Sequence, residues 1–159
     1  MDSIFTKLRL LLAGILGVAL LAVLGISGFF EYRYVMANRY MEKEQYEKAY
    51  TAFQKIPQFR DSEELAVESY YKMANACMQT EEYDSAEYYF LQLGEYKDSK
   101  DLFKEAYYRK AGKWLQEEQY SSAAYAYKNL KDYKDSRELY YSVFYEHGVK
   151  DLHDQKYSS

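Results

Sequence analysis

The chain has 159 residues, 48% of them hydrophobic, and a formal net charge of −4, so its length allows about one domain with a buried core. Acidic and basic residues are interspersed without a basic run, which argues against a nucleic-acid-binding surface, because phosphate binding requires clustered Lys and Arg. A single cysteine, Cys77, and two histidines, His147 and His153, exclude an internal disulfide and a structural zinc site.

The first predicted element is an apolar segment, residues 10–30, which contains no charged residue. At about 1.5 Å per residue, a helix of this length spans the roughly 30 Å of hydrocarbon in a bilayer. We therefore predict a transmembrane helix, preceded by a short cytoplasmic tail, residues 1–9. The alternative is a cleaved signal peptide with Lys7 and Arg9 as its basic region, but the apolar core of such peptides is usually about 7 to 15 residues long.

The charges around this segment do not decide its orientation, because basic residues lie on both sides of it. The short basic tail favours a signal anchor with a cytoplasmic N-terminus. We therefore expect a single-pass protein of the plasma membrane, with the rest of the chain, residues 31–159, outside the cytoplasm.

A four-residue phrase recurs with a constant step of 37 residues in this second part of the chain. Its three copies are Phe59-Arg60-Asp61-Ser62, Tyr96-Lys97-Asp98-Ser99 and Tyr133-Lys134-Asp135-Ser136. Four further columns keep the same step: Tyr46, Tyr83 and Tyr120; Ala49, Ala86 and Ala123; Phe53, Phe90 and Tyr127; Ile56, Leu93 and Leu130. A fixed period of this size indicates an array of structural repeats.

Each repeat is predicted to be a helical hairpin. Residues 63–79 have apolar positions at helical spacing, residues 79–82 form a polar break, and a second apolar helix face begins at Tyr83. In the first repeat the first helix covers residues 31 to about 43, and no proline or glycine follows Phe29 in this stretch. We therefore predict one long helix that continues from the membrane segment into the first repeat.

These columns resemble the tetratricopeptide repeat family, in the variant with a longer period and a Tyr-Lys-Asp-Ser ending that occurs in Gram-positive bacterial proteins. The resemblance also rests on the first helices, with small Ala37, Ala74 and Ala111 and large Tyr40, Cys77 and Trp114. It covers residues 31–159 and implies an all-α fold, in which the transmembrane helix continues into a right-handed superhelical stack of hairpins. The step exceeds the family's usual 34 residues, and Asp135 stands near the place of the family's closing proline.

The register divides this part into repeats at about 31–61, 62–98 and 99–135 and a partial fourth repeat, 136–159. Residues 155–159 align with residues 118–122, where a second helix begins. Either residues 136–152 form a terminal capping helix, or the chain is a piece of a longer protein.

No motif for catalysis or for a cofactor is found, neither a glycine-rich phosphate loop nor a Ser/His/Asp arrangement, so we expect no enzyme. The resemblance implies a concave surface lined by first helices, and its groove positions correspond here to Tyr34, Tyr71, Tyr108, Tyr145, Asn38 and Asn75. We therefore expect a membrane-anchored scaffold or adaptor that binds a protein or peptide partner. The alternative for the tyrosines is that they fill the space between helices.

Two other functions remain open at this point. The array could be the spacer of a larger envelope protein whose functional domain lies beyond Ser159, or a structural protein that self-associates as a weak homo-oligomer. The recurring phrase itself is predicted to be structural. Asp61, Asp98 and Asp135 would act as N-caps, each with an acid three residues later, the preceding aromatic residue would pack into the seam between hairpins, and the base between them would face water.

Overall fold

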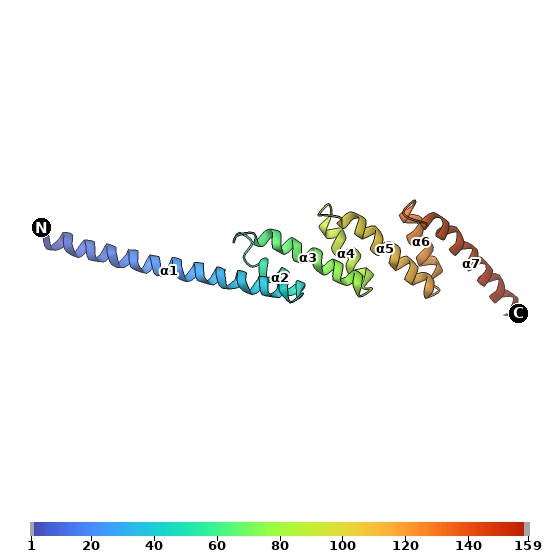
Figure 1. Cartoon of the computed structure of the whole chain (residues 1–159), viewed down its shortest axis with the longest axis horizontal. Helices are drawn as coiled ribbons and strands as arrows, with labels where there is room; N and C mark the ends of the chain where they lie inside the picture. Colours follow the sequence, from blue (N-terminus) through green and yellow to red (C-terminus); the bar gives the residue numbers. More distant parts are fainter. Residues whose placement is uncertain (1, 158–159) are drawn as a thin grey trace. The chain divides into compact units, whose positions relative to one another are not determined.

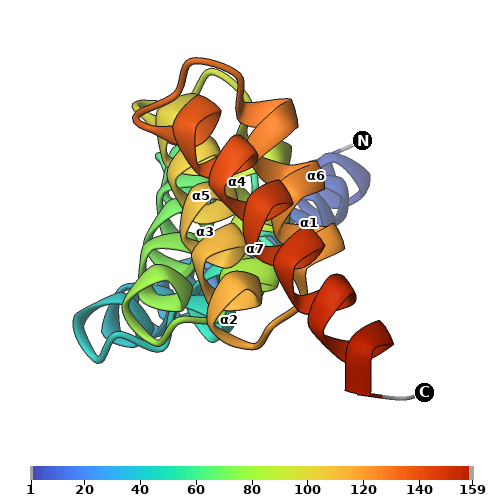
Figure 2. The same ribbon diagram turned by 90° about the vertical axis from the view of Figure 1, so that its right-hand side faces the viewer.

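A computed structural model describes the backbone of residues 2–157 and the side chains of residues 5–7 and 9–150. This part of the chain is all-helical, with seven helices and no strand (Figure 1 and Figure 2). The chain divides into two compact units, Met1–Ser69 and Tyr70–Ser159.

The first unit is dominated by α1, Asp2–Glu42, a helix of 41 residues. It runs without a break from the apolar segment into the first repeat, as the sequence predicts. Its apolar part is long enough to cross a membrane, and its side chains are exposed, with Leu16 at 69% and Leu21 at 71%. Ala37, further along the same helix, is fully buried. One helix therefore combines an exposed apolar surface, long enough for a membrane span, with the face of a packed helix.

The rest of the first unit packs against the end of α1. Helix α2, Tyr46–Phe53, lies against α1, and α3, Ser62–Gln79, begins after a loop. The core between them consists of Ala37, Ala49, Phe53 and Ala66. Because Ala37 and Ala49 have only a methyl group, α1 and α2 approach closely, and Phe53 fills the space beside them.

The second unit contains the C-terminal part of α3 and four further helices. They are α4, Tyr83–Leu93; α5, Ser99–Gln116; α6, Tyr120–Leu130; and α7, Ser136–Tyr157. The end of α3 at Gln79 coincides with the polar break predicted from the sequence, and α5 ends at Gln116, one step of 37 residues later. Two buried clusters hold this unit together, one around Phe90 between α3, α4 and α5 and one around Tyr127 between α5, α6 and α7.

Helix α7 differs from the repeat register. The alignment with α5 predicts a turn at residues 153–156, followed by a second helix, whereas α7 continues to Tyr157. The three earlier turns contain Glu44, Glu81 and Glu118 in the left-handed conformation, with φ of 56°, 61° and 58°. No residue of α7 has a positive φ in the part of the chain that is described, so the helix is not reversed there. Ser158 and Ser159 lie outside the described residues.

The recurring phrase also contains a left-handed residue. Arg60, Lys97 and Lys134 have φ of 53°, 50° and 51°, an uncommon conformation for residues other than glycine. The serine that follows is completely buried in each copy, and the hydroxyls of Ser62, Ser99 and Ser136 have no hydrogen-bond partner in the described structure. The phrase thus repeats a backbone turn and a small buried residue at the start of the next helix.

A further turn residue yields a prediction. Gly94 and Lys131 end α4 and α6 with nearly the same backbone, φ 57° and ψ −115° against φ 55° and ψ −114°. This is the glycine-favoured first central position of a type II′ turn, closed by hydrogen bonds from Tyr96 N–H to Leu93 O and from Tyr133 N–H to Leu130 O. Lys131→Gly should therefore raise the free energy of unfolding by about 1 kcal/mol, as measured by urea denaturation.

The matched control is Gly94→Ala. A Cβ at Gly94 would meet no atom within 4 Å, so its effect is conformational rather than steric. It should lower the free energy of unfolding by about 1 kcal/mol. Equal stability of Lys131→Gly and the unaltered chain would show that the lysine backbone is not strained.

Candidate functional site

Three of the four tyrosines predicted to line a groove are hydrogen-bonded to the recurring phrase of their own repeat. The hydroxyl of Tyr34 donates a hydrogen bond to Asp61 Oδ1 at 2.7 Å. Tyr71 and Tyr108 donate in the same way to Asp98 and Asp135, both at 2.6 Å. Each bond joins residues 27 apart, so the phrase at the end of a repeat is tied back to the first helix of that repeat.

The rings of these tyrosines pack against two other aromatic side chains. Tyr108 contacts Tyr127 on α6 and Tyr133 in the following loop, edge to face, with ring centroids 5.8 and 6.0 Å apart. Tyr34 and Tyr71 have the equivalent neighbours, Phe53 with Phe59 and Phe90 with Tyr96. Such pairs are worth about 0.5–1.5 kcal/mol each beyond the area that they bury.

The base of the phrase completes the arrangement. The Lys134 ammonium lies 4.8 Å from the centroid of the Tyr108 ring, Lys97 lies 4.7 Å from that of Tyr71, and the Arg60 guanidinium lies 4.9 Å from that of Tyr34. The sequence predicted that these basic residues face water. They are exposed, but their charged groups also lie over an aromatic ring. The left-handed backbone turns them over the ring, where a cation is attracted to the π-electrons.

We call each of these five-residue sets a tyrosine latch: the tyrosine, two aromatic residues, the base and the aspartate. The three latches are Tyr34, Phe53, Phe59, Arg60 and Asp61; Tyr71, Phe90, Tyr96, Lys97 and Asp98; and Tyr108, Tyr127, Tyr133, Lys134 and Asp135. Each latch closes a helical hairpin by contacts from its first helix, its second helix and the loop that follows.

The aspartates therefore have another partner than the predicted one. Asp98 holds the N-cap position of α5, and its carbonyl accepts the N–H of Leu102, but its side chain makes no capping hydrogen bond. Its carboxylate instead accepts the hydroxyl of Tyr71. Asp98 therefore lacks the predicted side-chain cap: its backbone, φ −98° and ψ 17°, lies outside the β region in which a capping side chain usually reaches back to the helix. The carboxylates of Asp61 and Asp135 accept tyrosine hydroxyls in the same way.

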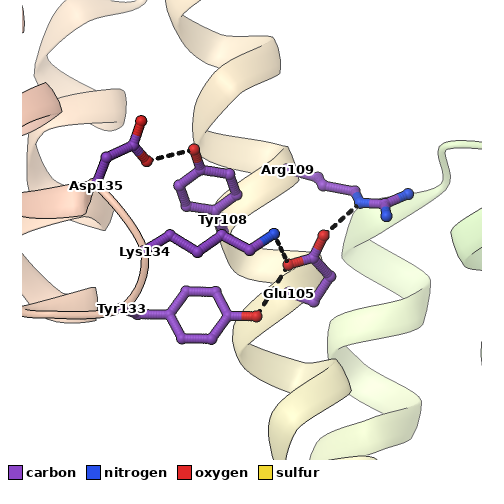
Figure 3. Close-up of polar contacts among 6 residues, drawn as sticks. All are labelled: Glu105, Tyr108, Arg109, Tyr133, Lys134 and Asp135. Carbon is purple, nitrogen blue, oxygen red and sulfur yellow. Dashed lines mark hydrogen bonds and ion pairs between the residues drawn. The ribbon is translucent and has the colours of Figure 1, made fainter.

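In the third latch a partly buried carboxylate extends the network (Figure 3). Glu105 on α5 accepts hydrogen bonds from Arg109 Nε and from the Tyr133 hydroxyl, both at 2.9 Å, and forms an ion pair with Lys134. Lys134 thus contacts the Tyr108 ring and Glu105 together. The equivalent base in the first latch, Arg60, pairs with Glu31 at 2.8 Å.

The protonation equilibria reflect these contacts. Burial alone would raise the pKa of Glu105, but the hydrogen bonds from Lys134, Arg109 and Tyr133 outweigh it and lower the pKa to about 2. The hydrogen bond to Asp135, together with burial, raises the pKa of Tyr108. Burial and the hydrogen bond to Glu105 raise the pKa of Tyr133 to about 12. Glu105 is therefore charged and both phenols are neutral near pH 7.

The depressed pKa of Glu105 predicts acid sensitivity. Because the folded pKa, about 2, is below the ordinary value of 4.5, Glu105 stabilises the fold above pH 4.5, and this contribution is lost as the pH falls toward 2. After allowance for its half-exposed partners, the loss should be about 1–2 kcal/mol. The urea concentration at the unfolding midpoint should decrease more between pH 6 and pH 3 for the unaltered chain than for Glu105→Gln. Parallel falls in both proteins would contradict this assignment.

The remaining predicted site residues differ in their surroundings. The amides of Asn38 and Asn75 each donate to a main-chain carbonyl one helical turn earlier, of Tyr34 and Tyr71, at 2.9 Å. Tyr145 on α7 stands in the tyrosine column but is 75% exposed. The contacts of Tyr34, Tyr71 and Tyr108 favour the alternative in which these side chains hold the hairpins together. A role of the column in partner binding stays a prediction.

A second feature is an open groove in the second unit, formed by α4, α5 and α6. Its volume is about 760 Å³, and its apolar wall includes Phe90, Leu91, Phe103, Tyr107 and Tyr125. Leu91 and Tyr125 are 59% and 66% exposed, although both are large apolar residues. Charged residues stand at the edge, among them Glu95 and Lys100, which form an ion pair at 2.8 Å. An apolar wall with a charged rim is typical of sites that bind peptides or small molecules.

Comparisons with protein-family models, with curated proteins and with solved structures find no match to this chain.

Sequence reasoning missed the groove residues because it followed the repeated columns. Leu91 and Tyr125 stand outside those columns, on the sides of α4 and α6 that do not enter the core. A search for large apolar residues off the buried stripe of each second helix would have found both. It would also have found Tyr88, which is 56% exposed.

Proposed function

We propose that this chain is a membrane-anchored scaffold of tetratricopeptide-like helix pairs that binds a protein or peptide partner in the groove of α4, α5 and α6. The observation that carries the proposal is the exposure of Leu91 and Tyr125 beside a groove of about 760 Å³. A partner that inserts an apolar side chain here would remove both residues from water, and such buried anchors supply most of the binding energy at interfaces.

The anchor in this proposal is the apolar part of α1. It is a single helix that is long and apolar enough to cross a membrane, and it continues into the first helix pair. We propose that it holds the repeats at the plasma membrane, outside the cytoplasm, as a right-handed stack. The tyrosine latches support such a stack, because they give each hairpin a fixed shape and leave the groove residues Leu91 and Tyr125 uncovered.

The proposal is tested by photo-crosslinking of the full chain in its native membranes. p-Benzoylphenylalanine in place of Leu91 or Tyr125 should give a discrete adduct with one partner after irradiation. The matched control carries the same group in place of Gln92, an exposed neighbour of Leu91 that does not line the groove. The adduct at Leu91 should disappear when Tyr125→Asp is added, since a charge in the apolar wall costs binding energy. Equal adducts at Leu91 and Gln92, or none at Leu91 and Tyr125, would contradict the proposal.

A further inference from the structure

A second hollow lies in the first unit, where α1 leaves its apolar segment. It lies between α1 and α2 and has a volume of about 610 Å³. One end is lined by Phe29, Tyr32 and Arg33, directly after the apolar segment, and the other by Tyr40 and Lys48. Helix α2 runs antiparallel to α1 along it, so the end of α2 returns toward the apolar segment.

The loop between α2 and α3 reaches the same level as the end of the apolar segment. The ring of Phe59 in this loop is stacked on Phe30, with centroids 5.8 Å apart and an angle of 19° between the planes. Lys55, at the start of the loop, lines the hollow beside Phe29 and Arg33 and also a smaller one beside Phe30. Lys55 therefore lines the same small hollow as Phe30, the residue at which the predicted span ends.

This level corresponds to the headgroup layer of a bilayer. If Phe30 marks the edge of the hydrocarbon, Arg33 stands about 4.5 Å beyond it along the helix. The polar layer on each side of a bilayer is about 5–8 Å thick. Phe29 and Tyr32 are 53% and 65% exposed and stand at the same level, where aromatic residues are enriched in membrane proteins.

The charges at this end of the hollow have no counter-ion among the described residues of the protein. The Arg33 guanidinium lies 4.6 Å from the centroid of the Phe29 ring. Within the described part of the chain neither Arg33 nor Lys55 forms an ion pair, whereas the nearby Arg60 is paired with Glu31. Among the lining residues Glu47 is the single acid, and it lies at the far end. Two cations thus face a hollow whose near end contains no carboxylate.

The other repeats provide an internal comparison for this loop. Gln58 corresponds to the acids Glu95 and Asp132 of the other repeats, and Phe59 corresponds to Tyr96 and Tyr133. Lys55 corresponds to the amides Gln92 and Asn129. The loop beside the apolar segment has therefore exchanged an acid for a neutral residue, a phenol for an apolar ring and an amide for a cation. Each change favours an environment of lipid tails and phosphates over water.

We propose that Arg33 and Lys55 bind the phosphate of an anionic phospholipid headgroup in this hollow, with Phe29, Phe30 and Tyr32 against its acyl chains. The inference rests on the membrane anchor of the proposed function and adds a lipid ligand to it. The stacked ring of Phe59 on Phe30 keeps the loop, and with it Lys55, at the depth of the phosphate.

The experiment uses the full chain, purified in mild detergent and titrated with phosphatidylglycerol or phosphatidylcholine, with bound lipid counted by native mass spectrometry. The unaltered chain should retain phosphatidylglycerol more tightly. The double variant Arg33→Gln/Lys55→Gln should lose this preference by about ten- to thirtyfold. The control, Arg39→Gln/Lys43→Gln, removes the same charge from exposed positions of the same region that do not line the hollow, and it should keep the preference.

Three results would overturn the inference: equal retention of the two lipids by the unaltered chain, an equal loss in both double variants, or displacement of phosphatidylglycerol by glycerol 3-phosphate, which would identify a soluble phosphate as the ligand. Carbonate extraction of membranes tests the anchor separately. Release of the unaltered chain by carbonate, with lipid preference retained, would contradict the anchor and not the lipid site. A chain that resists carbonate but shows no lipid preference would contradict the lipid site alone.

Discussion

Replacing Tyr108 by alanine is expected to destabilise the third hairpin by about 3 kcal/mol. The change removes a hydrogen bond to the Asp135 carboxylate at 2.6 Å and edge-to-face contacts with Tyr127 and Tyr133. It also removes the ring on which the Lys134 ammonium lies. A hydrogen bond to a charged group contributes about 1.5–3 kcal/mol and each aromatic pair about 0.5–1.5 kcal/mol, reduced here by partial exposure.

The measurement is hydrogen exchange of the backbone amides of α5 and α6 in the full chain, because repeat units open locally. A loss of 3 kcal/mol corresponds to exchange about a hundredfold faster. Tyr145→Ala is the matched control, since Tyr145 occupies the same register position on α7 but is 75% exposed, and its effect should stay within about 0.5 kcal/mol. Equal exchange rates in the two variants would show that the latch does not hold the hairpin.

A pair of arginines in the apolar part of α1 is expected to abolish membrane insertion. Leu16 and Leu20 lie near the middle of residues 10–30, are 69% and 61% exposed, and pack against no other helix in the described structure. An arginine at the centre of a transmembrane helix costs about 2.5–3.5 kcal/mol on insertion scales, so Leu16→Arg with Leu20→Arg should cost about 5–7 kcal/mol. The protein should move from the carbonate-resistant membrane fraction to the soluble fraction.

The control places two arginines beyond the apolar segment, as Val35→Arg with Glu42→Arg. Both positions are exposed on α1, so this variant should stay in the membrane fraction. If a signal peptide were cleaved instead, the unaltered mature chain would lack the segment and would itself be extracted by carbonate. Membrane retention of the Leu16/Leu20 variant would show that the segment does not cross the bilayer.

The sequence predicted the helices well because their causes are local or periodic. The step of 37 residues, the apolar columns and the polar breaks place the ends of α3 and α5 correctly, and the absence of proline and glycine after Phe29 predicts the continuity of α1. The apolar faces and the polar breaks depend on residues within one or two turns of each other, and the step of 37 residues repeats them along the chain.

The tyrosine latch could not be predicted in the same way. In a perfect repeat any two repeated positions are the same number of residues apart in every copy. The constant separation of 27 residues between Tyr71 and Asp98 is therefore no evidence that their side chains touch. The aspartate before a helix also has a local explanation as an N-cap, and this explanation needs only the neighbouring residues. Only the left-handed backbone of Lys97, φ 50°, turns the phrase toward the first helix. That conformation is uncommon for lysine, so the sequence does not reveal it.

Glu105 illustrates a further limit. A glutamate on a helix between charged neighbours is expected to be solvated, and its helical neighbour Arg109 explains only one of its contacts. Tyr133 and Lys134, 28 and 29 residues later, supply the others. The groove residues Leu91 and Tyr125 were missed for a similar reason. Their exposure depends on how α4, α5 and α6 pack and not on the spacing of the residues in the sequence.

The continuity of α1 has a mechanical consequence. A helix without a hinge transmits tilt and rotation along its axis, so the apolar segment and the first hairpin move as one rod. Glu42 lies about 18 Å beyond Phe30, and a tilt of about 20°, ordinary for membrane helices, would displace this end by about 6 Å. The tilt of a membrane-spanning helix depends on bilayer thickness. A change in thickness would therefore change the tilt of α1 and displace α2 and its loop sideways. The apolar segment would then control the position of the first hairpin as well as attach it to the membrane.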